Sequence, residues 1–237
     1  MMPNLRSVLM GLYTLGLAAV AVVGTFIEPT GRLYMWIARH IWGRVVLGIG
    51  GVRLETVGGE GVDWKKPYVV CANHASQLDI PALFGALPMP VRFLAKKSLF
   101  YIPIFGWSIW LARFIPVDRS AGRKSREALT KAAARIRKGP SLLVFPEGTR
   151  SPDGAIRKFK SGAFVMAIQA GIPVLPVAIR GSFEAFSRNT VKVTPGIIHI
   201  VIGTPIPTDR CTPSDKEALR QQVEDVITNM HRTGLPQ

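Results

Sequence analysis

From residue 52 onward, short apolar runs rich in β-branched residues alternate with stretches of helical periodicity. The strand-like runs are residues 52–57, 68–72, 91–95, 113–117, 141–145, 173–179, 191–194 and 197–202. The helical stretches include 123–138, 161–169 before a C-capping Gly171, and a last helix that Ser214 and Glu217 open as a capping box. This alternation predicts an α/β domain over residues 52–237, with a mixed, largely parallel sheet flanked by helices.

Residues 1–51 have a different pattern. Residues 7–27 form a run of 21 residues without a charged side chain. A helix rises about 1.5 Å per residue, so this run would reach about 30 Å, the thickness of the hydrocarbon core of a bilayer. After the turn signal EPTG, residues 32–50 form a basic amphipathic helix with Trp36 and Trp42, a composition typical of a membrane interface. The two segments predict a membrane-associated helical hairpin that precedes the α/β domain.

Other interpretations of the N-terminal run stay open. A cleaved signal peptide is disfavoured, because Arg6 is the only basic residue before the run and a basic amphipathic helix follows at once. A buried hairpin in a soluble protein is a second alternative. Length alone leaves open whether the first helix crosses the bilayer or dips into it and returns. Basic residues around the apolar helix favour the cytoplasmic face of the cell inner (plasma) membrane.

The charge of the chain restricts its partners. The net charge is +15 at neutral pH, and residues 92–160 alone contain sixteen Lys or Arg and four Asp or Glu. This predicts an anionic partner: a membrane, a phosphorylated substrate, an acidic carrier protein or a nucleic acid. Nucleic-acid binding normally interleaves aromatic with basic residues, and residues 119–138 contain no aromatic residue. A membrane-attached nucleic-acid binder is therefore the weaker hypothesis. Cys71 and Cys211 lack metal-ligand spacing, so no metal site or disulfide framework is indicated.

Two polar clusters follow predicted strands at their carboxyl ends, where α/β sheets bind ligands. The first is NHASQLD, residues 73–79, in which His74 has the chemistry of a general base and Asp79 can hold its tautomer. A loop that curls before the next helix would bring the two side chains together, and Asp79 is also placed to cap that helix. No GxSxG nucleophile elbow is present in the sequence, so the pair predicts a base that activates a substrate hydroxyl. Taken alone, the spacing also fits a plain N-cap and a loop histidine.

The second cluster, FPEGTRS at residues 145–151, has the composition of an anion-binding loop. Gly148 allows close backbone approach, Thr149 can donate a hydrogen bond, and Arg150 can grip a phosphate with two parallel hydrogen bonds. Glu147 is expected to accept from a substrate hydroxyl or to anchor a cation. An ordinary polar turn is the alternative.

Four blocks resemble, in order, the lysophosphatidate acyltransferase family, the 1-acyl-sn-glycerol-3-phosphate acyltransferases. They are NHASQLD, KKSLFYIPIFG with PVDR downstream, FPEGTRS and GIPVLPVAI, and they cover residues 73–179. One departure is Ser98, where many members of the family carry glutamate, so the role of that position stays open. The N-terminal helical pair also resembles the membrane-seating motif of bacterial members.

The resemblance implies a membrane-bound acyltransferase that moves a fatty acyl group from an acyl thioester to the sn-2 hydroxyl of lysophosphatidate, giving phosphatidate. His74 would be the general base and Asp79 would orient it. The implied substrate-binding residues are Lys96, Arg119 and Arg150 for the phosphate, and Glu147, Gly148 and Thr149 for the rest of the acceptor site. Asn73 or a backbone amide could stabilise the oxyanion, without a firm assignment. No metal or cofactor is expected, because a thioester already has a good leaving group.

The implied partners are lysophosphatidate, acyl carrier protein (as acyl-ACP) or acyl-CoA, and membrane lipids, and no nucleic acid. The acceptor leaves alternatives within the same fold, namely glycerol-3-phosphate or a lyso-aminolipid. The choice between acyl-ACP and acyl-CoA, the acyl-chain length and the oligomeric state stay open.

Overall fold

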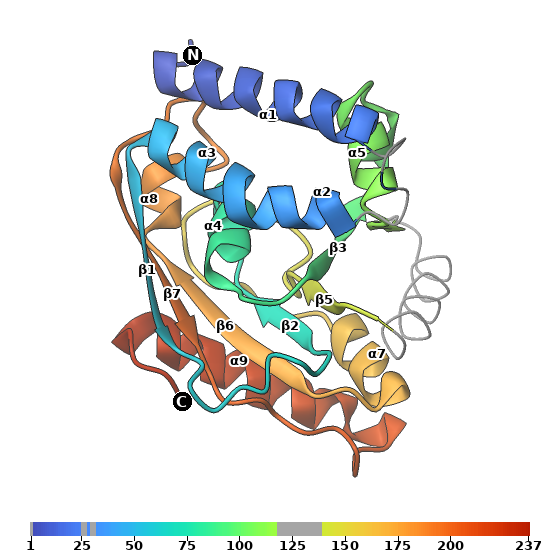
Figure 1. Cartoon of the computed structure of the whole chain (residues 1–237). Helices are drawn as coiled ribbons and strands as arrows, with labels where there is room; N and C mark the ends of the chain where they lie inside the picture. Colours follow the sequence, from blue (N-terminus) through green and yellow to red (C-terminus); the bar gives the residue numbers. More distant parts are fainter. Residues whose placement is uncertain (1, 25–27, 29–31, 118–138) are drawn as a thin grey trace.

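A mixed β-sheet forms the centre of the protein (Figure 1). The computed structural model describes residues 2–24, 28, 32–117 and 139–237. Within them, the strand order is β1-β7-β6-β2-β5-β3-β4. The strands are β1 (Val52–Gly58), β2 (Val69–Ala72), β3 (Val91–Lys96), β4 (Ile115–Val117), β5 (Ser141–Val144), β6 (Val174–Arg180) and β7 (Gly196–Ile202). Neighbouring strands are parallel, except that β6 and β7 are antiparallel. The prediction of a mixed, largely parallel sheet is confirmed.

Helices cover both faces of this sheet, and each face has its own apolar core. The α-helices of the described residues are α1 (Leu5–Gly24), α2 (Arg32–Ile37), α3 (Gly43–Gly50), α4 (Asp79–Ala86), α5 (Phe105–Leu111), α7 (Gly162–Ala170), α8 (Ser182–Phe186) and α9 (Lys216–Thr233). Side chains alternate along β2, so Val70 and Ala72 join the core under α3 and α4, while Val69 and Cys71 join the core over α7 and α9. All four are fully buried, which explains the continuous apolar run of this central strand.

The N-terminal helices lie on the α3–α4 side of the sheet. A π-helical turn, Ala38–Trp42, joins α2 to α3, and Trp42 Nε1 donates to Thr14 Oγ1 of α1 at 3.1 Å. Met10 of α1 belongs to the same buried core as Val46 and Leu47 of α3. Over most of its length α1 is exposed, and by length and hydropathy it could cross a membrane.

Two local expectations are wrong. Residues 191–194 do not form a strand, because the Asn4 side chain takes both hydrogen bonds of the Val193 backbone: Nδ2 donates to its carbonyl at 2.7 Å, and Oδ1 accepts from its N–H at 3.2 Å. The capping box is formed by Thr212 and Asp215, two residues before the expected position, so it opens a short 3₁₀ turn that leads into α9. The helix predicted at 123–138 lies outside the described residues.

Candidate active site

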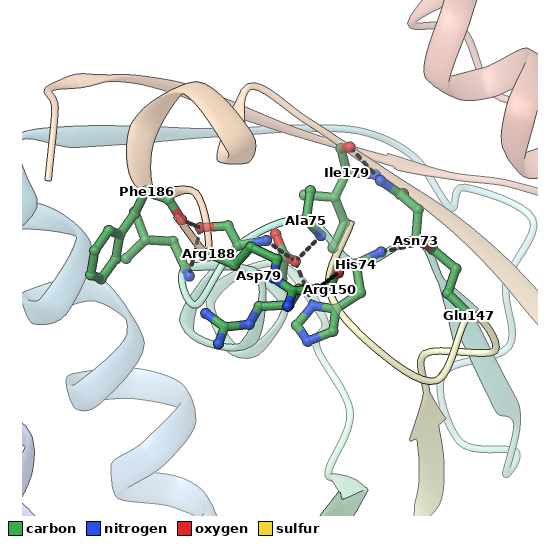
Figure 2. A network of polar contacts seen from close by, with 11 residues as sticks. Asn73, His74, Ala75, Asp79, Glu147, Arg150, Ile179, Phe186 and Arg188 are labelled. Carbon is green, nitrogen blue, oxygen red and sulfur yellow. Dashed lines mark hydrogen bonds and ion pairs between the residues drawn. The ribbon is translucent and has the colours of Figure 1, made fainter. Parts of the chain in front are cut away.

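The carboxyl ends of β2, β3, β5 and β6 lie at one edge of the sheet, because these strands run parallel to one another. Segments that are distant in sequence therefore converge there (Figure 2). His74 follows β2, Lys96 ends β3, Glu147 and Arg150 follow β5, and Arg188 comes after β6 and α8.

His74 and Asp79 are joined by a hydrogen bond from Nδ1 to Oδ2 of 2.7 Å, as the sequence predicted. The Asp79 side chain is fully buried, and that of His74 is 10% exposed. Because Nδ1 donates to the carboxylate, the lone pair of the ring lies on Nε2. The pair has the geometry of a general base held in one tautomer by a carboxylate.

Asp79 organises the loop before α4 and does not cap that helix. Its Oδ2 also accepts from the backbone N–H groups of Ala75 and Ser76, both at 2.8 Å. No N–H group of α4 bonds to the Asp79 side chain. The expected N-cap is therefore wrong, since the carboxylate turns back toward three donors of the loop.

The imidazole of His74 is stacked on Phe145, a residue that the sequence analysis did not single out. The ring centroids are 3.9 Å apart and the planes differ by 13°. Phe145 directly follows β5, so the stacking ring comes from the neighbouring strand. The stack and the bond to Asp79 together restrict rotation of the imidazole, so they fix the direction in which Nε2 points. The sequence contained one signal for this contact: Phe145 ends one predicted strand and His74 follows another, at the carboxyl ends where the polar clusters lie.

Glu147 connects the two polar clusters. Its Oε1 accepts from the backbone N–H of His74 at 2.7 Å, and its Oε2 accepts from the N–H of Arg157 at 3.2 Å. A second link runs from the N–H of Ser151 to the carbonyl of His74, at 2.7 Å. Burial raises the pKa of Glu147 to about 7, against the smaller opposing effect of the two backbone donors. Both carboxylate oxygens accept hydrogen bonds from the backbone. These contacts favour a role for Glu147 in positioning His74 over the expected contact with substrate.

Arg150 lies beside the His74–Asp79 pair (Figure 2). Its side chain is half-buried, and Nη1 is buried without a hydrogen-bond partner among the described residues. Burial and the nearby charge of Arg188 lower the pKa of Arg150, while the charge of Asp79 raises it. The loop reaches this position through Gly148, whose φ of +79° lies in the left-handed region that favours glycine. A cationic donor beside this pair is suited to bind an anionic group of a ligand.

The other predicted binding residues are exposed or lie outside the described residues. Lys96 is exposed at the end of β3, on the same edge of the sheet, and Thr149 is exposed in the loop before Arg150. Arg119 lies outside the described residues, so its expected role stays a prediction. Within the described ranges, no group of three or more His, Cys, Asp or Glu side chains could hold a metal ion.

Two polar side chains attach the loop of His74 to β6 and to α8. Asn73 Nδ2 donates to the carbonyl of Ile179 at 2.9 Å, and its Oδ1 accepts from the N–H of Ile179 at 2.7 Å. Ser76 Oγ donates to the carbonyl of Phe186 at 2.7 Å. Because both ends of the Asn73 amide are engaged with β6, this side chain extends the sheet, and its suggested role at an oxyanion is not supported.

The sequence model of the Acyltransferase family matches residues 53–180, which include both polar clusters. The 1-acyl-sn-glycerol-3-phosphate acyltransferase of Saccharomyces cerevisiae is 33% identical over 234 residues, which cover 94% of this chain and 77% of the yeast protein. The chain belongs to this acyltransferase family. The resemblance inferred from the four sequence blocks is thereby confirmed.

Two further family members define the extent of the similarity. The crystal structure of the 1-acyl-sn-glycerophosphate (LPA) acyltransferase of Thermotoga maritima has a TM-score of 0.79 and 29% sequence identity, and the similarity covers 98% of this chain and 97% of that one. Human 1-acyl-sn-glycerol-3-phosphate acyltransferase alpha is 31% identical over 183 residues. This chain spans 65% of the length of the human protein.

The raised pKa of Glu147 predicts a pH-dependent stability. A carboxyl group whose pKa rises from 4.5 to about 7 on folding contributes stability below about pH 4.5, and this contribution is lost as the pH rises through 7. Glutamine does not titrate. The melting temperature of the wild type minus that of Glu147→Gln should therefore decrease as the pH is raised from 5 to 8. Thermal unfolding in detergent measures this difference, with Glu60→Gln, an exposed loop position, as the baseline. A difference that stays constant with pH would contradict the buried, titrating Glu147.

Proposed function

We propose that this protein transfers a fatty acyl group from an acyl thioester to the sn-2 hydroxyl of lysophosphatidate and so forms phosphatidate. The observation that carries the proposal is the His74–Asp79 pair at the sheet edge, with the guanidinium of Arg150 beside it. Family membership supports the reaction class, and the names of the relatives, which are 1-acyl-sn-glycerol-3-phosphate acyltransferases, support this acceptor.

In this mechanism, His74 Nε2 accepts the proton of the sn-2 hydroxyl as its oxygen attacks the thioester carbonyl. Asp79 stabilises the imidazolium that forms, through the bond to Nδ1. The tetrahedral intermediate then collapses: the new C–O bond of the ester remains, the C–S bond breaks, and the thiolate receives the proton from His74. The chain's own residues supply the base and its orientation, and the donor supplies the leaving group.

The phosphate of the acceptor is assigned to Arg150, with Lys96 and Arg119 as further cationic residues. Arg150 is the best supported of the three, because its buried Nη1 lacks a partner among the described residues and the residue lies beside the His74–Asp79 pair. Burial strengthens a charge-assisted hydrogen bond to phosphate. Glu147 is assigned a positioning role, since it holds the backbone of His74.

We further propose that the N-terminal helices seat the protein on the inner membrane, with the α/β domain on the cytoplasmic face. α1 presents Leu9, Leu12 and Val20 to the outside, and α5, which contacts α1, presents Trp107 and Trp110, which are 58% and 69% exposed. Large exposed apolar side chains clustered on neighbouring helices mark a membrane or protein contact. A membrane would place the lipid acceptor beside the sheet edge that carries His74.

An acceptor and donor panel tests the function. Purified protein in detergent or in vesicles is given lysophosphatidate, glycerol-3-phosphate or a lyso-aminolipid, each with acyl-CoA and with acyl-ACP, and mass spectrometry identifies the products. We expect phosphatidate from lysophosphatidate, with at least one of the two donors. Acylation of another acceptor in preference to lysophosphatidate would reject the proposed substrate while leaving the reaction class in place.

A further inference from the structure

Arg188, which the sequence analysis did not single out, lies at the junction of the two polar clusters. Its Nη1 donates to the backbone carbonyl of Arg150 at 3.1 Å. The preceding residue, Ser187, forms an antiparallel bridge with Ser76 in the loop of His74. Arg188 is therefore fixed relative to both the base and the anion-binding loop, although it comes from a third segment that begins after β6.

Arg150 and Arg188 place two positive charges next to each other. The charge of Arg188 lowers the pKa of Arg150, and the negative charge of Asp79 raises it. Oδ2 of Asp79 already accepts three hydrogen bonds, from His74 and two backbone amides. In the part of the chain that the structure describes, no carboxylate forms an ion pair with either guanidinium. Two adjacent cations repel each other, so the arrangement favours a bound anion of more than one charge.

Both guanidinium groups have donors left for such an anion. Arg150 Nη1 is buried without a hydrogen-bond partner among the described residues. Arg188 is exposed and, among the described residues, donates one hydrogen bond, to the carbonyl of Arg150, which leaves the rest of its planar fork for a ligand. One guanidinium group can bind two phosphate oxygens through parallel hydrogen bonds. Two guanidinium groups therefore match a phosphate with three terminal oxygens better than a phosphate with two terminal oxygens.

We propose that Arg188 is a specificity-determining residue that, together with Arg150, selects an acceptor with a dianionic phosphate monoester over one with a monoanionic phosphate diester. This inference rests on the proposed function, because it concerns the headgroup of the same acceptor. A phosphate monoester has three terminal oxygens and gains its second charge near pH 6. A diester headgroup offers two terminal oxygens and a single charge, so it leaves one of the two cations without a partner.

The test compares lysophosphatidate with lysophosphatidylglycerol of the same acyl chain, in wild type and Arg188→Gln. We expect the variant to lower the ratio of kcat/KM for monoester over diester about tenfold, mainly through KM, as for one lost hydrogen bond to a charged group. In the wild type, KM for lysophosphatidate should fall between pH 5.5 and 7.5 as the phosphate gains its second charge, and this fall should be smaller in the variant. Arg188→Lys keeps the charge and should restore part of the ratio.

Arg210→Gln is the matched control, because Arg210 is an exposed arginine on the loop after β7. Its monoester-to-diester ratio should equal that of the wild type. If wild type acylates lysophosphatidate and Arg188→Gln keeps the full ratio, the inference is overturned and the proposed function stands.

A binding measurement separates the inference from the proposed function. Inorganic phosphate at pH 8 should raise the melting temperature of the wild type, and the rise should be smaller in Arg188→Gln but unchanged in Arg210→Gln. A wild type that shows this Arg188-dependent stabilisation but fails to acylate lysophosphatidate would reject the proposed function and support the dianion site. Equal stabilisation of wild type and Arg188→Gln would overturn the site.

Discussion

His74→Ala should lower kcat/KM for acyl transfer to lysophosphatidate by about 10²-fold to 10⁴-fold, the contribution of a positioned general base. Nε2 of His74 is the basic atom that Asp79 and Phe145 hold in place at the sheet edge. The variant should still fold, because the buried Asp79 carboxylate keeps its two bonds from the N–H groups of Ala75 and Ser76. Steady-state kinetics with purified protein, together with the melting temperature, measures both effects.

His199→Ala provides the control. This histidine lies on β7, is paired with Glu55 at 3.3 Å and has a 43% exposed side chain, so its loss should leave kcat/KM close to the wild-type value. Retention of more than about a tenth of the activity by a folded His74→Ala protein would reject His74 as the base, given the expected range.

Asp79→Asn should lower kcat by about 10²-fold to 10³-fold while the loop keeps its structure. The asparagine oxygen should take the place of Oδ2 and accept the same three hydrogen bonds. The opposite orientation is unfavourable, because it would place the amide NH₂, itself a donor, against those three donors. The new NH₂ group then replaces Oδ1, which has no hydrogen-bond partner among the described residues. The tautomer of His74 is kept and the negative charge is lost, so the effect should be smaller than the ~10⁴-fold loss known where this replacement also inverts the tautomer.

The measurement for Asp79→Asn is kcat under saturating acceptor and donor, with the circular dichroism spectrum and melting temperature as checks on folding. Asp209→Asn, an exposed position on the loop after β7, is the matched control. A folded Asp79→Asn protein with kcat within threefold of the wild type would show that the charge of Asp79 does not assist the base.

The fold class was predictable because the main strands have strong local signals. The central strand β2 is fully buried, so its run of apolar residues identifies it. Residues 191–194, Val-Lys-Val-Thr, are also rich in β-branched residues and still form no strand, because the side chain of Asn4, 189 positions away from Val193, takes the hydrogen bonds of that backbone. Local composition carries no record of such a distant partner.

The site was predictable in part. His74 and Asp79 lie five positions apart, so one loop brings them into contact. Glu147 was expected to contact the substrate or a cation, and Asn73 was one candidate for the oxyanion, because both are polar residues in the right segments. Their hydrogen bonds go instead to backbone groups of Arg157, His74 and Ile179. A polar side chain in a loop can bind substrate or hold the loop, and its partners decide between the two.

The sequence by itself determined the alternating architecture, the two polar clusters at strand ends and the apolar N-terminal helix, because each depends on residues that are close together in the chain. It also determined the basic charge, which depends on composition alone. The tertiary structure alone decided that Phe145 stacks on His74, that Glu147 joins the two clusters and that Arg188 lies against Arg150. These contacts join residues that are 71, 73 and 38 positions apart. They arise from the order of the parallel strands, which brings the carboxyl ends of β2, β5 and β6 together at one edge of the sheet.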